Sequence, residues 1–285
     1  MKRTNNIKKN ELKIISNTIN IGLDKQVRFL HITDNHITRG DTSGWNRTEA
    51  FDVDYSGCAE DYFLQAVNYA KANNMPILHT GDMIDSFSEE NFEFIDKHFN
   101  DVDYIYAAGN HDFCHMLGKA KEDYAYKWEK INEIAPHIKN NLYFYSRIIG
   151  GVNIVTLDDT YYTISEGQIE ALKAEVAKGY PIILAMHVPL SAESLLDVDF
   201  SITDAAYVVA APQSVLDSYC EFRRLQQTPD ATTLEAVKYI QNEPVIKAFI
   251  AGHCHKNRED MIEGRLPQFV THGTYAGYVR EFYIK

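Results

Sequence analysis

Six apolar runs of strand length, each followed at once by a polar cluster, constrain the fold of this chain more than any other feature. The runs are Val27–Ile32, Pro76–His79, Tyr104–Ala107, Val152–Leu157, Pro181–Met186 and Val245–Ile250. Val, Ile, Leu and Phe nearly fill them, which is typical of strands that other elements cover on both faces. The sequence therefore predicts buried sheets.

Helical patterns lie between these runs. Ser165 and Gln168 form a capping box ahead of apolar residues at helical spacing, and Gly179 ends that pattern. Strands that alternate with helices favour an α/β fold. The pair Gly150–Gly151 between two apolar runs predicts a hairpin, so we expect mixed sheets with antiparallel as well as parallel neighbours.

The domain organisation is predicted to be simple. No repeat, low-complexity tract or Pro/Gly-rich linker divides the 285 residues. We therefore expect an N-terminal extension over residues 1–25 and a single domain over residues 26–285. A long interval separates His187 from His253. Part of it, around residues 190–232, is expected to be an insertion that caps the functional site, and we call it the cap segment.

The polar clusters that follow the strands contain carboxylates, imidazoles and one amide. They are Asp34-Asn35-His36, Gly81-Asp82 with Asp85, Gly109-Asn110-His111-Asp112, His187, and Gly252-His253-Cys254-His255. Such groups gather at the carboxyl ends of strands in α/β sheets, so we expect them at one rim. In extended chain, residues two apart point the same way, so an Asp-x-His or His-x-His triplet can present two ligands together. Carboxylate and imidazole ligands without a thiolate pair suit Zn, Mn or Fe.

The order D-x-H, G-D-x-x-D, G-N-H-D, a single H and G-H-x-H resembles the calcineurin-like metallophosphoesterase superfamily, over most of the chain. The resemblance implies a four-layer αββα sandwich that holds two divalent metal ions, Mn, Fe or Zn, at the strand ends. It implies one ion on Asp34, His36 and His255, the other on Asn110, His187 and His253, and a bridge at Asp82. The residues after Gly81-Asp82 are not those of purple acid phosphatases or protein Ser/Thr phosphatases. What remains resembles the bacterial phosphodiesterase and phosphatase branch.

Asp82 fits the bridging role on physical grounds as well. Two cations a few ångströms apart repel each other strongly, so a shared carboxylate between them is needed. Gly81 lets the backbone turn closely before it. The carbonyl oxygen of Asn110 is neutral and a weak ligand alone, so its assignment rests on the resemblance. Asp85 is expected to accept a hydrogen bond from a histidine ligand and to orient that ring.

The hypothesis for catalysis is in-line attack on phosphorus by a hydroxide that bridges the two ions. His111 is assigned as the general acid that protonates the leaving oxygen. Asp112, its neighbour in sequence, is expected to fix the tautomer of His111 and to raise its basicity. The sequence thus predicts a metal-dependent phosphoric ester hydrolase, a phosphodiesterase or phosphatase acting on mono- or diesters. Residues that bind the rest of the substrate are left unassigned.

The charge of the chain restricts its partners. Lys and Arg number 28 and Asp and Glu 40, which gives a net charge of −12. Such a surface repels nucleic acid and acidic membranes, so a small phosphate ester or nucleotide is the expected substrate and long nucleic acid is not expected. No apolar run is long enough to span a bilayer and no secretory signal follows the basic N-terminus, so we expect a cytoplasmic protein. Nothing in the sequence indicates an oligomeric state.

Two other functions are compatible with the same fold. A nuclease is the first, and the net charge of −12 disfavours it because each phosphate contact needs a Lys or Arg. A non-catalytic binding scaffold is the second. Such a scaffold would be expected to have lost metal ligands or the general acid, whereas this chain keeps all of them.

Overall fold

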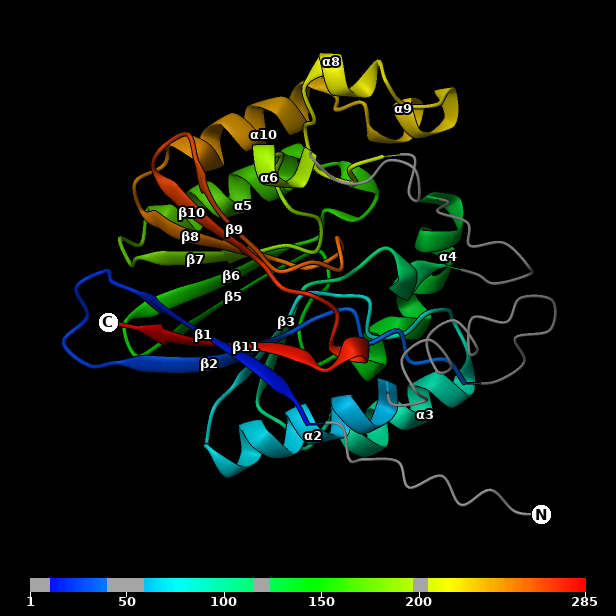
Figure 1. The fold of residues 1–285 in the computed structure, drawn as a ribbon, viewed down its shortest axis with the longest axis vertical. Helices are drawn as coiled ribbons and strands as arrows, with labels where there is room; N and C mark the ends of the chain where they lie inside the picture. Colours follow the sequence, from blue (N-terminus) through cyan, green and yellow to red (C-terminus); the bar gives the residue numbers. More distant parts are fainter. Residues whose placement is uncertain (1–10, 40–58, 115–123, 197–204) are drawn as a thin grey trace.

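Two mixed β-sheets lie face to face and helices cover the outer face of each, so the molecule has four layers in the order αββα (Figure 1). The computed structural model describes residues 11–39, 59–114, 124–196 and 205–285. The predicted α/β class, the sandwich and its mixed sheets are confirmed.

The first sheet has five strands and is formed by the two ends of the chain. Its spatial order is β1 (Lys13–Ile19), β11 (Tyr278–Ile284), β2 (Val27–Ile32), β3 (Ile77–His79) and β4 (Tyr104–Tyr106). The last three run parallel, and β11 is antiparallel to β2. Helices α2 (Ala59–Ala72) and α3 (Glu89–His98) lie on this side of the molecule, and the end of α4 (Tyr124–Ile134) packs into the same core through Ile134 (Figure 1).

The second sheet has six strands. Its order is β5 (Phe144–Ile149), β6 (Val152–Leu157), β7 (Ile182–Ala185), β8 (Ile246–Ala251), β10 (Leu266–Val270) and β9 (Arg258–Ile262). The four inner strands are parallel, and the edge strands β5 and β9 are antiparallel to their neighbours. Helices α5 (Glu166–Val176) and α10 (Ala231–Asn242) cover it, with the short helices α6 (Glu193–Leu196), α8 (Gln213–Leu216) and α9 (Glu221–Gln227) nearby.

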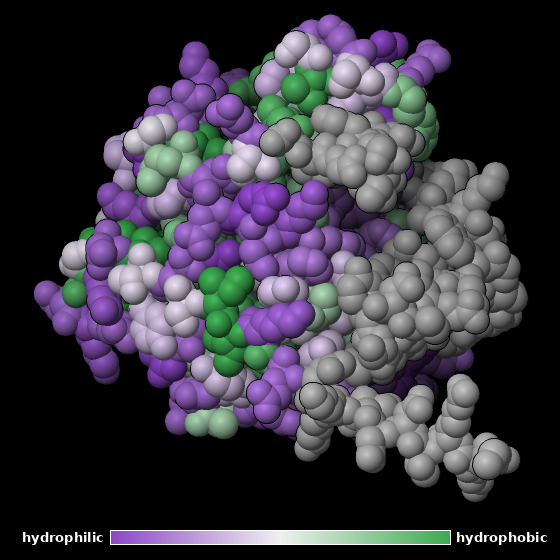
Figure 2. Space-filling model, viewed as in Figure 1, coloured by the Kyte–Doolittle hydropathy of each residue, from purple (hydrophilic) through white to green (hydrophobic). Residues whose placement is uncertain are grey.

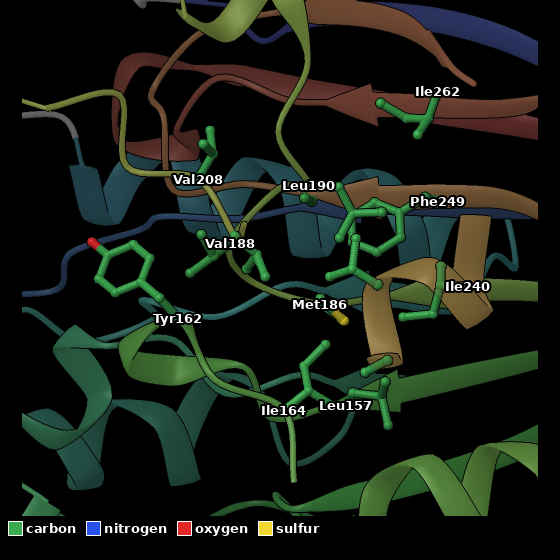
Figure 3. Packing of buried hydrophobic residues seen from close by; sticks show 14 of the residues in the cluster. Leu157, Tyr162, Ile164, Met186, Val188, Leu190, Val208, Ile240, Phe249 and Ile262 are labelled. Atoms are coloured by element: carbon green, nitrogen blue, oxygen red, sulfur yellow. The ribbon is translucent and has the colours of Figure 1, made fainter. Parts of the chain in front are cut away.

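Alternation along the strands builds the layers. In β7, Ile183 contributes to the core between the two sheets, whereas Ile182 and Leu184 contribute to the core under α5 and α10. Figure 3 shows this outer core, where Ile240 of α10 packs near Phe249 of β8. Strands with both faces covered are almost continuously apolar, which is why the apolar runs of the sequence mark them so clearly.

Local signals in the sequence account for several element boundaries. The side chain of Ser165 accepts a hydrogen bond from Gln168 N while the Gln168 side chain accepts one from Ser165 N, so the predicted capping box begins α5. Gly150 and Gly151 have φ values of 56° and 94°, and they connect β5 to β6 in the predicted hairpin. Four short 3₁₀ turns complete the described elements: η1 (His111–Phe113), η2 (Ala135–His137), η3 (Thr160–Tyr162) and η4 (Thr274–Ala276).

The N-terminal segment departs from its expected role as an extension. Lys13–Ile19 forms β1, which pairs in parallel with β11 at the edge of the first sheet. The Asn17 side chain accepts a hydrogen bond of 2.5 Å from Arg280, and Ile19 packs in the core between the sheets. The described part of residues 1–25 therefore belongs to the domain.

The cap segment packs onto the second sheet. Residues 197–204 of its predicted range lie outside the described residues. The rest contains α6, α8 and α9, and Val208 and Leu216 are buried in the outer core. Val209 N donates to Pro189 O at 2.9 Å, and α9 contacts η3. Its role as a cap stays a prediction.

The surface is mainly hydrophilic on the face shown in Figure 2, with hydrophobic side chains gathered in small groups. This agrees with the high content of acidic residues. Within the ranges that the structure describes, no helix has both the length and the apolar character needed to cross a membrane.

Candidate metal centre

The seven residues predicted as metal ligands lie together where strands of the two sheets reach their carboxyl ends. Asp34 and His36 follow β2, Asp82 follows β3, Asn110 follows β4, His187 follows β7, and His253 and His255 follow β8. Six of them form two groups whose ligand atoms lie within 4.8 Å of one another: Asp34, His36 and His255, and Asp82, His187 and His253. The structure therefore brings together residues from both sheets.

In the first group, the Asp34 carboxylate has one oxygen fixed by the protein and one directed at the histidines. Oδ2 accepts hydrogen bonds from Thr33 Oγ1 at 2.6 Å and from His253 N at 2.9 Å. A side chain at Gly252 would collide with this carboxylate, so only glycine fits there. Oδ1 is buried without a hydrogen-bond partner and lies 3.2 Å from His255 Nε2. A cation at this point would satisfy it.

The two histidines of the first group face each other through the same atom. His36 Nε2 lies 3.1 Å from His255 Nε2. His36 Nδ1 lies 2.9 Å from Asp85 Oδ1, and since a carboxylate only accepts, the ring proton sits on Nδ1. The lone pair of His36 Nε2 is therefore directed into the group, as a metal ligand requires.

In the second group, both ring nitrogens of His187 meet acceptor atoms. Its Nδ1 lies 2.6 Å from the Thr80 carbonyl oxygen, so Nδ1 carries a proton. Its Nε2 lies 3.2 Å from Asp82 Oδ2, 3.1 Å from Asn110 Oδ1 and 3.0 Å from His253 Nδ1. Several lone pairs converge at this point, and few N–H or O–H groups are there to donate to them. A divalent ion fits such a donor set.

Asp82 lies between the two groups. Its Oδ2 is 3.2 Å from His187 Nε2 of the second group and 3.8 Å from His36 Nε2 of the first. Its Oδ1 accepts a hydrogen bond of 2.7 Å from His111 N. The carboxylate is thus fixed within reach of both groups, which is the placement that a bridging ligand needs.

The electrostatics of the centre favour added positive charge. Burial lowers the pKa of His187, but the carboxylates of Asp82, Asp34 and Asp159 together outweigh burial and raise that pKa to about 10. The pKa of His36 rises to about 9, because the effects of Asp34 and Asp85 exceed that of burial. Burial raises the pKa of Asp82, yet the surrounding histidines hold it well below its usual range. A proton or a metal ion can supply the positive charge, and the converging lone pairs suit the ion.

The backbone at the centre is strained. Asp34, His36, Asp82, His253 and His255 have positive φ values between 46° and 64°. A non-glycine residue in such a conformation costs on the order of 1–3 kcal/mol and persists only where its surroundings enforce it. The hydrogen bonds to the Asp34 and Asp82 carboxylates provide that enforcement. Strain of this kind gathers at functional sites.

His111 is held by a different carboxylate from the one predicted. Its Nδ1 lies 3.1 Å from Asp85 Oδ1 and 3.2 Å from the Asp85 carbonyl oxygen. The same Oδ1 also contacts Nδ1 of His36, a predicted ligand, so Asp85 meets both rings. The expectation that Asp112 fixes the tautomer of His111 is wrong, because His111 Nδ1 contacts Asp85, whereas the Asp112 carboxylate accepts hydrogen bonds from Gly109 N and the Tyr106 hydroxyl.

Asp112 instead holds two loops of the centre together. Its carboxylate accepts hydrogen bonds from Gly109 N at 2.8 Å, Met83 N at 3.1 Å and the Tyr106 hydroxyl at 2.5 Å. Burial and the nearby Asp82 raise its pKa to about 6. Asp112 thus fixes the loop that carries Asp82 against the loop that carries Asn110.

The structure adds three residues that the sequence motifs do not single out. Asp159 accepts hydrogen bonds from His187 N and Val188 N, both at 3.0 Å. The Tyr162 hydroxyl contacts His253 Nε2, and the Tyr275 hydroxyl contacts His255 Nδ1. Asp159 comes almost directly after β6, so the rule that polar residues at strand ends build the site could have found it. The chain has 18 tyrosines, and no pattern in the sequence distinguishes Tyr162 and Tyr275 from the others.

Comparison with known proteins supports the family predicted from the motifs. The sequence profile of the calcineurin-like phosphoesterase family matches residues 27–257. A comparison with curated protein sequences finds no match. Among solved structures, a dimetal phosphatase from Danio rerio is similar at a TM-score of 0.56 and 13% identity, over 88% of each chain. A phosphopantetheinyl hydrolase from Mycobacterium tuberculosis has a TM-score of 0.45 and 13% identity, over 88% of this chain and 91% of its own.

The matched range contains every predicted ligand, and the described fold places those ligands in two adjoining groups. At 13% identity, the similarity to the Danio rerio phosphatase shows a shared fold only, whereas the profile match covers most of the chain. On this evidence the chain belongs to the calcineurin-like phosphoesterase family.

Proposed function

We propose that this protein hydrolyses small phosphate esters with the help of two divalent metal ions. The observation that carries the proposal is the pair of adjoining ligand groups with Asp82 between them. The first ion would be held by Asp34, His36 and His255, the second by Asn110, His187 and His253, and both by Asp82. The Danio rerio protein of the same fold is a dimetal phosphatase, which supports this class of reaction here.

The ions, when bound, supply activated water and neutralise charge on the phosphoryl oxygens. The residues of the chain supply the proton. With His111 Nδ1 against Asp85, Nε2 is the ring nitrogen left to donate a proton to the leaving oxygen. The His111 side chain is 16% exposed, whereas Asp85 is fully buried. A group that meets substrate needs this access, so the geometry supports His111 as the general acid and Asp85 as its positioning residue.

The substrate proposed is a small phosphate ester or a nucleotide. The net charge of −12 opposes long nucleic acid, which argues against a nuclease. Complete ligand groups and a positioned His111 argue against a non-catalytic scaffold. Preference for mono- or diesters, the identity of the ions among Mn, Fe and Zn, and a cytoplasmic location stay predictions from the sequence.

The test is hydrolysis of p-nitrophenyl phosphate and bis-p-nitrophenyl phosphate by protein stripped with EDTA and then supplied with Mn²⁺, Fe²⁺ or Zn²⁺. Activity that disappears with the metal and returns with it supports the proposal, and the faster substrate distinguishes a phosphatase from a phosphodiesterase. Activity that survives complete removal of metal would overturn it. Bound metal without activity on either ester, or on a panel of nucleotides, would favour the scaffold.

A further inference from the structure

The four histidines of the centre differ in what holds the ring nitrogen that faces away from the ligand groups. For His36 that nitrogen contacts the Asp85 carboxylate, and for His187 it contacts the Thr80 carbonyl oxygen. For His253 and His255 the partner is in each case a tyrosine hydroxyl. One histidine in each group is therefore held by an obligate acceptor, and the other by a phenol.

The two tyrosine contacts are made through opposite ring atoms. His253 presents Nδ1 to His187 Nε2 at 3.0 Å, and its Nε2 lies 3.2 Å from the Tyr162 hydroxyl oxygen. His255 presents Nε2 to His36 Nε2 at 3.1 Å, and its Nδ1 lies 3.0 Å from the Tyr275 hydroxyl oxygen. The two residues are separated only by Cys254, yet they need opposite tautomers to act as ligands.

A neutral imidazole binds a metal through its unprotonated nitrogen, so the proton must sit on the other nitrogen and needs an acceptor there. For His253 this acceptor is the Tyr162 oxygen, and for His255 it is the Tyr275 oxygen. A phenol oxygen can accept this proton, and its own hydrogen remains available to another partner. The tautomer of each histidine is therefore tied to one tyrosine.

Both tyrosines are firmly held. Tyr162 is 1% exposed, and Figure 3 shows its ring near Val188 at the edge of the outer core, with the hydroxyl pointing away from that core. Its φ of 68° is a strained conformation that the core packing maintains. Tyr275 is 2% exposed, and its ring centroid lies 4.9 Å from that of His255. Rigid partners of this kind can fix a ring orientation.

From this geometry we infer that Tyr162 and Tyr275 are positioning residues for the metal centre, each of which controls the occupancy of a different one of the two ion positions. Tyr275 acts through His255 on the position formed with Asp34 and His36. Tyr162 acts through His253 on the position formed with Asp82 and His187. The inference rests on the proposed two-ion function, and it concerns residues that no motif of the chain assigns.

The test measures metal binding rather than turnover. Metal-free wild-type protein, Tyr162→Phe and Tyr275→Phe are titrated with Mn²⁺ by calorimetry, and paramagnetic resonance distinguishes single from paired ions. Each substitution removes one hydroxyl from a ring that keeps its packing. Loss of a partner behind a metal ligand weakens affinity by about 10–100-fold. We expect that loss in one of the two binding steps for each variant, with the paired-ion signal reduced and the other step unchanged.

Tyr104→Phe is the matched control, because the Tyr104 hydroxyl is also buried and accepts a hydrogen bond, from Lys139 N at 2.8 Å, away from the centre. It should leave both steps unchanged. The decisive comparison combines the tyrosine substitutions with the loss of a histidine ligand. In a His255→Ala background, Tyr275→Phe should have no further effect on Mn²⁺ affinity, while Tyr162→Phe should still weaken it.

Three results would overturn the inference: Phe variants that bind both ions as tightly as wild type, variants that each weaken both steps equally, or an effect of Tyr275→Phe that persists without His255. Wild-type protein that binds fewer than two ions with Mn²⁺, Fe²⁺ and Zn²⁺ alike would instead refute the proposed function on which the inference rests. The two failures are distinguished by the wild-type titration alone.

Discussion

At the scale of single residues, one carboxylate oxygen of Asp85 contacts two imidazole rings. His36 and His111 lie 2.9 and 3.1 Å from Asp85 Oδ1, one as a candidate ligand and the other as the candidate general acid. Their rings are close, with centroids 4.8 Å apart. The candidate metal centre and the candidate proton donor are therefore positioned by the same buried group.

His111→Asn should lower turnover of an alkyl phosphate ester by roughly 10²–10⁴-fold, because the leaving oxygen loses its proton donor. Metal content should stay at the wild-type value, as measured by elemental analysis alongside kinetics. His137→Asn is the control, since His137 also pairs with a carboxylate, Asp96 at 2.9 Å, but on the surface. If His111→Asn empties the centre of metal, His111 is a ligand and the assignment is wrong.

Asp82→Asn should empty at least one of the two ion positions. The amide keeps the shape of the side chain but loses the charge that lies between the two groups, 3.2 Å from His187 and 3.8 Å from His36. Metal-to-protein stoichiometry after dialysis checks this. Asp96→Asn, at a partly exposed carboxylate with its own histidine partner, controls for loss of charge alone. Two tightly bound ions in Asp82→Asn would exclude the bridge.

A core histidine outside the ligand groups gives a prediction on pH. His79 Nδ1 accepts a hydrogen bond from Gly81 N, and its Nε2 lies 2.7 Å from Asn35 Oδ1, so the neutral ring is satisfied on both sides. Burial lowers its pKa from 6.5 to about 3. The unfolded chain then binds the proton more readily, so the stability that His79 contributes is present above pH 6.5 and is lost as pH falls toward 3.

The measurement compares wild type with His79→Gln in urea unfolding at several pH values. Between pH 6.5 and 3 the wild type should lose stability faster than the variant by up to about 1.4 kcal/mol per pH unit. Above pH 7 the two curves should run parallel, because the histidine is neutral in both states there. Parallel curves over the whole range would show that His79 is not held neutral.

At this scale the sequence predicts which polar residues meet at the candidate centre, but not which partners support them. The D-x-H and G-H-x-H ligands are local patterns at strand ends, and the described structure brings them together. Asp112 was the expected partner of His111 because it is adjacent in sequence, whereas the partner found is Asp85, which precedes it by 26 residues. The pairing of a carboxylate with a histidine ring depends on how the loops that follow neighbouring strands are arranged in space. A local sequence pattern does not predict that arrangement.

At the scale of elements, hydrophobic patterning predicts the inner strands because both of their faces are buried. The run Val152–Leu157 coincides with β6, and Val27–Ile32 with β2. The edge strand β1 alternates between exposed and partly buried residues and pairs with β11 from the other end of the chain. Its pattern is weak and its partner is distant, so it is predicted as an extension.

A chain that lacks residues 1–19 should unfold at a lower temperature than the full chain and should associate. Removing β1 leaves the edge of β11 unpaired and takes the Asn17 partner from the buried Arg280. A chain that lacks only residues 1–10 keeps β1 and controls for length. Calorimetry and size-exclusion chromatography measure both effects. Equal unfolding temperatures for the two truncated chains would contradict the structural role of β1.

At the scale of the whole molecule, the candidate metal centre lies where the two sheets meet. Asp34, His36, Asp82 and Asn110 follow strands of the first sheet, while His187, His253 and His255 follow strands of the second. Each ligand group contains residues from both sheets. An ion in either group would therefore connect the halves of the sandwich as well as serve chemistry.

Removal of metal should lower the unfolding temperature. An ion that binds only the folded chain adds RT ln(1 + [L]/Kd) to its stability, about 2.7 kcal/mol at a free concentration of 100 Kd. Unfolding temperature should thus rise with the logarithm of Mn²⁺ concentration above Kd, as differential scanning fluorimetry of EDTA-treated protein can show. Mg²⁺ at the same concentration, which prefers oxygen ligands, should have a smaller effect. Identical curves with and without Mn²⁺ would contradict the bridging of the sheets.

The left-handed backbone at the ligand residues has a consequence for how such a protein changes over generations. Asp34, His36, Asp82, His253 and His255 occupy conformations that glycine would adopt without strain. As long as the ions are needed, selection retains these side chains despite the conformational cost. In a lineage that no longer needed the ions, glycine at any of these positions would relieve strain, so the motifs would erode together and the erosion would leave a more stable protein.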